Sequence, residues 1–273
     1  MPLFETLVYS LVVALGEIFP VSANAHVELV SKILGWNTPS TAFLGVSTLG
    51  TALGILIALR HDWASIFSAL IQVILFRKKP MTFDERLPFF LLITTGPVIL
   101  GHVYLQEMAS GFFKDPLWLF AGLVLGAVLM GLTEIYNRKL RGMFDWNAGD
   151  SFLIGISQLA ELIPGLGRTT GVLFAGMARN YHRNVVVKFQ FYAATPVLIY
   201  FGITQLRGQH AIRELGRVSF YFSLFFTTAI AALATSSFVK NSEYKKLNSA
   251  VIYRICFVVV LGTVIGLKAK GVL

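Results

Sequence analysis

Charged side chains are scarce in this 273-residue chain, at 14% of all residues, against about 25% in a typical soluble domain. Most of the surface therefore does not face water, and a soluble globular fold is excluded. The chain has a single cysteine, Cys256, which excludes an internal disulfide and a cysteine-based metal site. The first residues lack a basic segment and a cleavage site, so no cleaved signal peptide is expected. No polar stretch is long enough to fold separately, which predicts one domain over residues 1–273.

The formal net charge is +9, which by itself is typical of nucleic-acid binders. The lysines and arginines, however, fall in short clusters between apolar segments instead of along one face. Such clusters are expected in the cytoplasmic loops of membrane proteins. We therefore expect a bilayer, and not a nucleic acid, as the partner of this chain.

Apolar residues are abundant, at 55% of the chain. A helix needs about 20 apolar residues to cross a hydrocarbon core about 30 Å thick. Six segments meet this requirement: 41–60, 87–106, 116–137, 185–206, 218–239 and 248–267. Isolated polar residues in or near them are interpreted as membrane-edge or loop residues, because long charged side chains near the ends of spans reach toward water. These are Glu134, Lys188, His210 and Arg254.

Two further apolar stretches, residues 3–34 and 151–178, are interrupted by Pro20 and Pro164 and carry several charges. Broken backbone at membrane depth is tolerated only where protein or a water-filled cavity surrounds it. We interpret both stretches as re-entrant helical hairpins whose tips meet inside the protein. The predicted fold is an all-α integral membrane protein with six transmembrane helices and two re-entrant hairpins.

The two interrupted stretches resemble each other. LGEIFPVSANAH (15–26) aligns without gaps on LAELIPGLGRTT (159–170), with identities at leucine, glutamate and proline. Each stretch is followed by three predicted spans, and an odd number of spans inverts the second copy. We predict inverted repeats over roughly 1–140 and 145–273, an architecture known from transporters.

Basic residues also predict orientation. If residues 61–86 form one loop with a short amphipathic helix, thirteen basic residues lie on one side and seven on the other. The thirteen are Arg60, Arg77, Lys78, Lys79, Arg86, Arg138, Lys139, Arg141, Arg179, Arg183, Lys240, Lys245 and Lys246; the seven are Lys32, Lys114, Arg207, Arg213, Arg217, Lys268 and Lys270. The side with thirteen is predicted to be cytoplasmic, which leaves both termini outside.

A buried charge in a bilayer costs about 2.5–3.5 kcal/mol on insertion scales and therefore indicates a function or a partner. Arg168 lies in PGLGRTTG (164–171), where Gly165 and Gly167 expose backbone N–H groups and two threonines add hydroxyls. A glycine-rich turn that opens a helix beside an arginine is typical of a phosphate site. The alternative is a plain helix break in which Arg168 pairs with Glu161 or a carbonyl.

The first interrupted stretch carries a second group of polar residues, Glu17, Ser22, Asn24 and His26. A carboxylate and an imidazole on one bent segment can supply acid–base groups, and either can hold a metal. The alternative is that Glu17 only pairs with Arg168 and that His26 only bonds a carbonyl. Glu161 occupies the position equivalent to Glu17 in the second stretch, with Gln158 on the same helical face.

Taken together, EIFPVSANAH and QLAELIPGLGRTTG (158–171) resemble the undecaprenyl-diphosphatase family of bacitracin-resistance membrane phosphatases over nearly the whole chain. The resemblance implies hydrolysis of undecaprenyl (polyprenyl) diphosphate to the monophosphate and phosphate at the outer face of the bacterial inner membrane. That reaction recycles the lipid carrier of peptidoglycan assembly, often with a divalent cation such as Mg²⁺ or Ca²⁺. Oligomeric state stays open, with a homodimer as one candidate.

Transferred by position, the resemblance implies a catalytic set, a substrate-binding set and a cation site. The catalytic set is Glu17, Ser22, His26 and Arg168; the substrate-binding set is Arg168, Thr169, Thr170, Gly165, Gly167, Asn24 and Gln158; the cation site is Glu17 with Glu161. The chain departs from the family pattern at Val13, where an acidic residue is usual, and at Ala23, where a serine is usual. A transporter of polyprenyl phosphate, or a silent lipid-binding relative, is therefore the alternative function.

Overall fold

In the computed structural model the chain is all-helical over the described residues, which are 1–115, 117–207, 211–242 and 247–269. The first half contains α1 (Leu3–Ile18), α2 (Ala23–Leu34), α3 (Thr41–Ala58), α4 (Arg60–Leu75), α5 (Phe83–Phe112) and α6 (Leu117–Tyr136). The second half contains the short turn η1 (Met143–Asp145), α7 (Ala148–Gln158), η2 (Leu159–Leu162), α8 (Arg168–Ala178), α9 (Arg183–Leu206), α10 (Ala211–Leu215), α11 (Arg217–Asn241) and α12 (Asn248–Ala269). Among the predicted positions, residue 116, His210, Lys245, Lys246 and Lys270 lie outside the described residues.

Six of these helices are long and apolar enough to cross a membrane: α3, α5, α6, α9, α11 and α12. They coincide with the six predicted segments, which confirms the membrane-protein class and the all-α fold. The amphipathic helix predicted after residue 60 is α4, which is not one of the six. Its 16 residues would extend only about 24 Å at 1.5 Å per residue.

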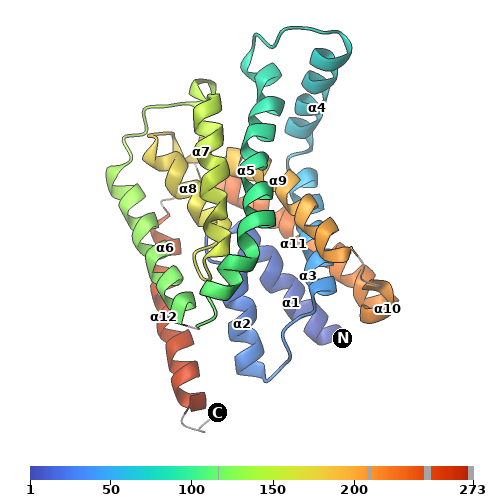
Figure 1. The fold of residues 1–273 in the computed structure, drawn as a ribbon, viewed down its shortest axis with the longest axis vertical. Helices are drawn as coiled ribbons and strands as arrows, with labels where there is room; N and C mark the ends of the chain where they lie inside the picture. The colour runs from blue at the N-terminus through green and yellow to red at the C-terminus, as the bar shows by residue number, and fades with distance from the viewer. Residues whose placement is uncertain (116, 208–210, 243–246, 270–273) are drawn as a thin grey trace.

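Two pairs of shorter helices, α1–α2 and α7–α8, lie against the long helices (Figure 1). The two pairs correspond to the interrupted stretches of the sequence. The longest of the four, α1, has 16 residues, which is shorter than the span of a bilayer core. The helical pairs are thus present, while their re-entry into the bilayer and the inverted repeat stay predictions.

Packing is densest where α3 contacts α11 and α9, and where α1 contacts α11. The largest cluster of buried apolar side chains joins α1, α3, α5, α8, α9 and α11. Both helical pairs are held against this cluster. The turn that joins α1 to α2 faces the segment that joins α7 to α8. The fold therefore places the polar tips of the two pairs inside the protein.

A polar cluster at one end of the bundle fixes where α7 begins and α8 ends. Asp150 is 2% exposed and accepts hydrogen bonds from Arg141 (2.7 Å), Arg179 (2.8 Å) and Tyr181 (2.6 Å). Burial alone would raise the pKa of Asp150, but these hydrogen bonds outweigh burial and hold its pKa below the ordinary value. The cluster thus ties the second helical pair to the connections on either side of it.

Replacing Asp150 by asparagine is expected to lower the melting temperature of the purified protein, with the largest loss near neutral pH. A carboxylate whose folded pKa is depressed stabilises the fold above its ordinary pKa of about 3.9 and loses this contribution as pH falls through the folded value. The difference between wild type and Asp150→Asn should therefore shrink below about pH 4. The matched control is Asp145→Asn, an exposed residue of η1 that lies just before α7. An equal, pH-independent effect of both changes would contradict the assignment.

Candidate active site

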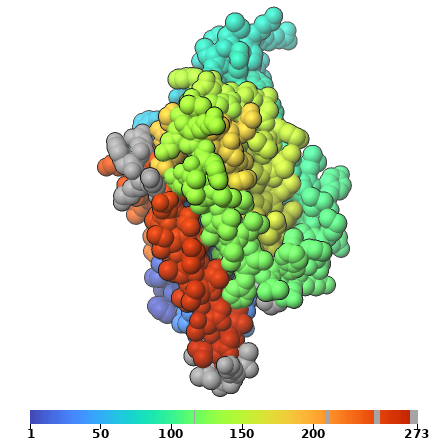
Figure 2. All heavy atoms as spheres, turned by 90° about the vertical axis from the view of Figure 1, so that its left-hand side faces the viewer, coloured from blue at the N-terminus to red at the C-terminus, as the bar shows by residue number. Residues whose placement is uncertain are grey.

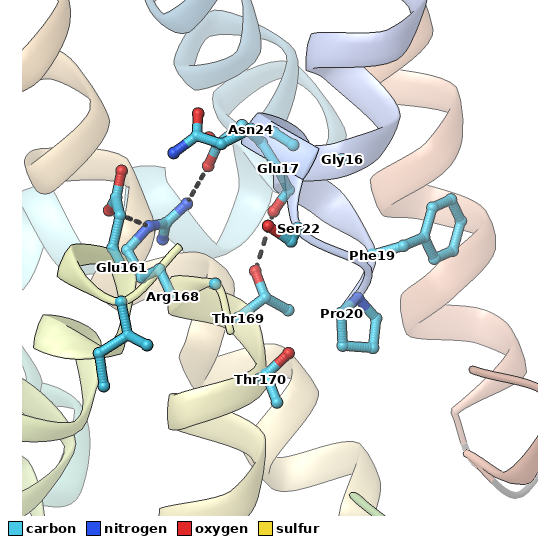
Figure 3. Close-up of a pocket in the computed structure, with 13 residues that line it drawn as sticks. Gly16, Glu17, Phe19, Pro20, Ser22, Asn24, Glu161, Arg168, Thr169 and Thr170 are labelled. Atoms are coloured by element: carbon cyan, nitrogen blue, oxygen red, sulfur yellow. Dashed lines mark hydrogen bonds and ion pairs between the residues drawn. The ribbon is translucent and has the colours of Figure 1, made fainter. Parts of the chain in front are cut away.

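The turn between α1 and α2 lies against the segment that precedes α8, so that the tips of the two helical pairs meet (Figure 3). Gly16 allows the first turn to close, because a Cβ there would lie 2.4 Å from Cα of Ala23. Gly167 has a φ of +80°, a conformation that favours glycine, and it packs over Ser22. These glycines bring residues 151 positions apart, Glu17 and Arg168, into contact.

Arg168, the first residue of α8, is the centre of the site. It is 3% exposed, and its Nη2 donates to Oε2 of Glu17 at 2.7 Å while its Nε lies 3.6 Å from Oε2 of Glu161. Within the described part of the chain, Nε and Nη1 have no hydrogen-bond partner. A buried guanidinium with unused donors is suited to bind an anion, and the fork geometry matches a phosphate.

The two threonines that follow Arg168 already have protein partners. The hydroxyl of Thr169 donates to the backbone carbonyl of Glu17 at 2.9 Å and accepts from the amide of Gln190 at 3.3 Å. The hydroxyl of Thr170 accepts from Arg254. Their first role in this arrangement is therefore to hold α8 in place, Thr169 against α1 and α9 and Thr170 against α12.

The polar cavity between the tips has a volume of about 20 Å³. It is lined on one side by Glu17, Ser22 and Asn24 and on the other by Glu161 and Arg168. A volume of about 10–15 Å³ is the minimum for one water molecule, so the cavity is too small for a phosphate group. An anion can reach Arg168 only if a carboxylate, most directly that of Glu17, moves away from it.

His26 does not line this cavity. Its Nδ1 lies 2.8 Å from the carbonyl oxygen of Ser22, its Nε2 lies 2.6 Å from the hydroxyl of Tyr253, and its ring stacks on Phe257 at 4.0 Å. The imidazole thus faces α12 and touches the site only through the backbone of Ser22. The predicted juxtaposition of Arg168 with Glu17 is present in the structure, whereas that of Arg168 with His26 is not.

Gln158 lies in a second, larger cavity of about 270 Å³ beside the site. It is fully buried, and neither atom of its amide has a hydrogen-bond partner among the described residues. Asn24 and Glu161 line both cavities, and His102 of α5 lines the larger one. The larger cavity reaches Phe113 and Gln205 near the ends of α5 and α9, and thus connects the site with one end of the bundle.

Gly165 shapes the segment before α8. Its φ is +85°, and a Cβ there would lie 2.2 Å from the carbonyl oxygen of Leu119 in α6. Both the backbone conformation and this close approach require glycine. Gly165 therefore acts on the path of the chain, and its carbonyl oxygen accepts from Arg254 at 3.1 Å.

Arg254 of α12 was predicted to be a membrane-edge or loop residue, and this prediction is wrong. The side chain is fully buried and donates to the carbonyl oxygens of Pro20 (2.7 Å), Leu166 (2.7 Å) and Gly165, and to Thr170. One guanidinium thus bonds the tips of both helical pairs. The signal in the sequence was a lone charge in the middle of an apolar span, which by default indicates a functional or structural partner.

The acidic residues of the site bear on cation binding. Over the described residues no group of three or more histidine, cysteine, aspartate or glutamate side chains converges, while Glu17 and Glu161 share Arg168. Magnesium is commonly held by one or two carboxylates together with substrate phosphates. The donor set therefore fits a cation that binds with a phosphorylated substrate.

The fold and site define a multi-pass helical membrane protein with a buried arginine between two carboxylates at the meeting point of two short helical pairs. The family model described as bacitracin resistance protein BacA matches residues 6–260, and the chain belongs to this family. It is similar to the undecaprenyl-diphosphatase of Chlorobium chlorochromatii (strain CaD3), with 26% identity over 99% of both chains. It is also similar to the undecaprenyl-diphosphatase of Thermobifida fusca (strain YX), with 28% identity over 76% of this chain and 71% of the relative. Its identity with undecaprenyl-diphosphatase 3 of Frankia alni is 30% over 78% of this chain and 76% of the relative.

Proposed function

We propose that the chain hydrolyses polyprenyl diphosphate, of the undecaprenyl class, to the monophosphate and inorganic phosphate. The observation that carries this proposal is Arg168, a buried guanidinium with two unused donors that lies between carboxylates from both helical pairs. Phosphoryl transfer depends mainly on positioning and on charge stabilisation. The names of the relatives, undecaprenyl-diphosphatase, support this choice of substrate.

In the proposed reaction the substrate diphosphate replaces Glu17 at Arg168, because the cavity of about 20 Å³ has no room for both. The freed Glu17 and Glu161 are the residues that would hold a divalent cation, Mg²⁺ or Ca²⁺, which neutralises phosphate charge when bound. Arg168 then binds the phosphoryl group that is transferred. An attacking oxygen forms a bond to the terminal phosphorus, and the bond to the bridging oxygen breaks to leave polyprenyl monophosphate.

The attacking group is proposed to be a water molecule, which gives inorganic phosphate directly, or Ser22, which gives a phosphoserine that water hydrolyses in a second step to release inorganic phosphate. In either case the attacking hydroxyl loses its proton to solvent. Position 23, where the family usually has serine, is alanine, and the hydroxyl of Thr169 is engaged with Glu17. Ser22 lines the cavity opposite Arg168. Since His26 contacts only the carbonyl of Ser22 at this turn, we assign it a positioning role there.

We further propose that the site acts at the outer face of the bacterial inner membrane. The cavity around Gln158 reaches the ends of α5 and α9, which the distribution of basic residues predicts to be outside. The direct test is release of phosphate by the purified chain in detergent from polyprenyl diphosphate. The absence of release across Mg²⁺, Ca²⁺ and a range of pH would reject the proposal.

Glu161→Gln is expected to raise the cation concentration needed for half-maximal phosphate release, because one of the two proposed cation ligands loses its charge. The loss should be recovered in part at high cation concentration, whereas a structural defect would not be. The matched control is Glu28→Gln, an acidic residue of α2 that pairs with Lys32 away from the cavity. An unchanged cation dependence in Glu161→Gln would remove Glu161 from the cation site.

A second candidate function, movement of polyprenyl phosphate across the membrane, is favoured by one observation. The small cavity at Arg168 adjoins a larger cavity near the ends of α5 and α9 and another at the end of α11. Since α9 and α11 are consecutive antiparallel spans, these two larger cavities approach the site from opposite ends of the bundle. A small site inside the bundle that is approached from both ends fits alternating access.

His26→Gln separates the two candidates. If the chain only moves lipid, this change should be mild in a vesicle assay of polyprenyl phosphate movement, because no proton transfer is required. If the chain hydrolyses diphosphate, the turn around Ser22 must be held in place and phosphate release should fall. Lipid movement in vesicles without any phosphate release in detergent would favour the transporter.

A further inference from the structure

A groove of about 550 Å³ lies in the angle between the end of α11 and the start of α12. Its floor is formed by Leu11 and Leu15 of α1 and by Phe19 and Pro20 of the turn that follows. This volume is within the range of about 300–1,000 Å³ typical of ligand pockets. The polar cavity at Arg168, in contrast, has room for little more than one water molecule.

The groove exists because two consecutive membrane helices diverge. α12 packs mainly against α6, whereas α11 packs mainly against α3 and α1. Figure 2 shows α12 lying along α6 at the surface of the molecule. The space between α11 and α12 is therefore open toward the side of the bundle, where the hydrocarbon of the bilayer lies.

The chemistry of the groove changes along its length. Its middle is apolar, with Leu15, Phe238 and Leu247, and the rings of Phe19 and Phe238 lie 5.2 Å apart. The end of the groove that is farther from Arg168 is polar, with Asn241 and Ser242 at the end of α11. Its inner end is formed by the bonded pair His26 and Tyr253.

The inner end of the groove adjoins the site. Gly16, Phe19 and Pro20 line both the groove and the polar cavity that contains Arg168. A molecule in the groove thus ends at the same turn of chain that carries Ser22 into the cavity. This continuity selects the occupant. A phospholipid would keep its phosphate at the polar end of the groove, by Asn241 and Ser242. A ligand with its phosphates at Arg168 would instead extend its hydrocarbon from Pro20 into the groove.

We propose that the groove between α11 and α12 holds the isoprenoid chain of a polyprenyl phosphate or diphosphate whose head group lies toward Arg168. This inference rests on the proposed function for the identity of the head group. Lipid tails are as apolar as the groove, so the gain is in packing and orientation and not in a hydrophobic driving force. The groove therefore fixes the direction from which the diphosphate enters the site.

The test is photo-crosslinking with a polyprenyl monophosphate that carries a diazirine in its first isoprene units, applied to the full chain in phospholipid nanodiscs. Labelled peptides identified by mass spectrometry should contain residues of the groove from α1, α11 and α12. Excess unlabelled polyprenyl phosphate should suppress the labelling, and excess phospholipid should not. Because the probe is a monophosphate, labelling does not require hydrolysis.

Ala250→Trp, which fills the groove from α12, should reduce this labelling by about tenfold, the change expected from a loss of about 1.4 kcal/mol in binding. It should also raise KM for C55 diphosphate, because the isoprenoid chain loses its place in the groove. Val259→Trp is the matched control, because Val259 lies on the same helix, is 64% exposed and is not part of the groove. This control should behave as wild type in both assays.

The outcomes separate the two proposals. Labelling of the groove without phosphate release from any diphosphate would reject the hydrolase and retain the binding site. Phosphate release with labelling elsewhere, or with labelling that phospholipid suppresses, would reject the binding site and retain the hydrolase. Equal labelling of wild type and a folded Ala250→Trp variant would also overturn the inference.

Discussion

Arg168→Ala is expected to reduce phosphate release from polyprenyl diphosphate by at least about a thousandfold, as removal of an arginine that stabilises a transferring phosphoryl group does in other enzymes. The guanidinium is the cationic group that lines the small polar cavity, and it has two donors without hydrogen-bond partners in the described part of the chain. Its loss also leaves Glu17 and Glu161 to repel each other without a cation between them. The measurement is kcat/KM for phosphate release by the purified variant.

Arg168→Lys tests geometry as distinct from charge. Lysine keeps the positive charge but cannot reproduce the planar fork that binds two oxygens, so only a part of the activity should return. Arg183→Ala is the matched control, because it removes another buried arginine that pairs with a glutamate, Glu134, at 2.7 Å. Full activity in a folded Arg168→Ala variant would place the chemistry elsewhere.

Arg254→Gln is expected to lower the melting temperature strongly and to abolish activity even in the fraction that remains folded. The wild-type side chain donates to carbonyl oxygens of both helical tips, at Pro20 and at Gly165 and Leu166. Glutamine has two donors and a shorter reach, so several buried carbonyls lose their partner at about 1–3 kcal/mol each. Thermal unfolding in detergent, followed by phosphate release after mild purification, measures both effects.

Arg254→Lys should be intermediate, since an ammonium group retains the charge but binds fewer carbonyls at once. Tyr253→Phe is the control on the neighbouring residue, and it removes only the hydrogen bond to His26. If Arg254→Gln unfolds at the wild-type temperature and releases phosphate normally, Arg254 does not hold the tips together. A loss of stability with normal activity would restrict its role to folding.

The six spans follow from the sequence because each depends only on local composition. A run such as residues 218–239 contains no charge and must be surrounded by apolar material, whatever the rest of the chain does. The helical pairs are predicted for a similar reason, since Pro20 and Pro164 interrupt apolar stretches that also carry charges. Likewise, a charge as costly as Arg168 needs a partner, and the carboxylate of Glu17 is that partner in the structure.

The contacts of His26 and Arg254 depend on distant residues and were not predictable in this way. His26 is four residues from Ser22, but its ring is held by Tyr253, 227 positions away. Arg254 has acceptors 234, 89, 88 and 84 positions away. Its position in a span gave no information about which helices α12 would meet.

The sequence by itself determined the membrane class, the number of long spans and the residues that had to be paired if buried, because hydropathy and the cost of a buried charge are local properties. Only the tertiary structure decided that Arg168 meets two carboxylates in a small polar cavity, that His26 faces α12, and that α11 and α12 diverge around a groove. These features depend on helix packing, about which hydropathy and the cost of a buried charge carry no information. Glu17 lies 151 positions from Arg168 and Tyr253 lies 227 positions from His26, while α11 and α12 are consecutive but diverge because they pack against different helices.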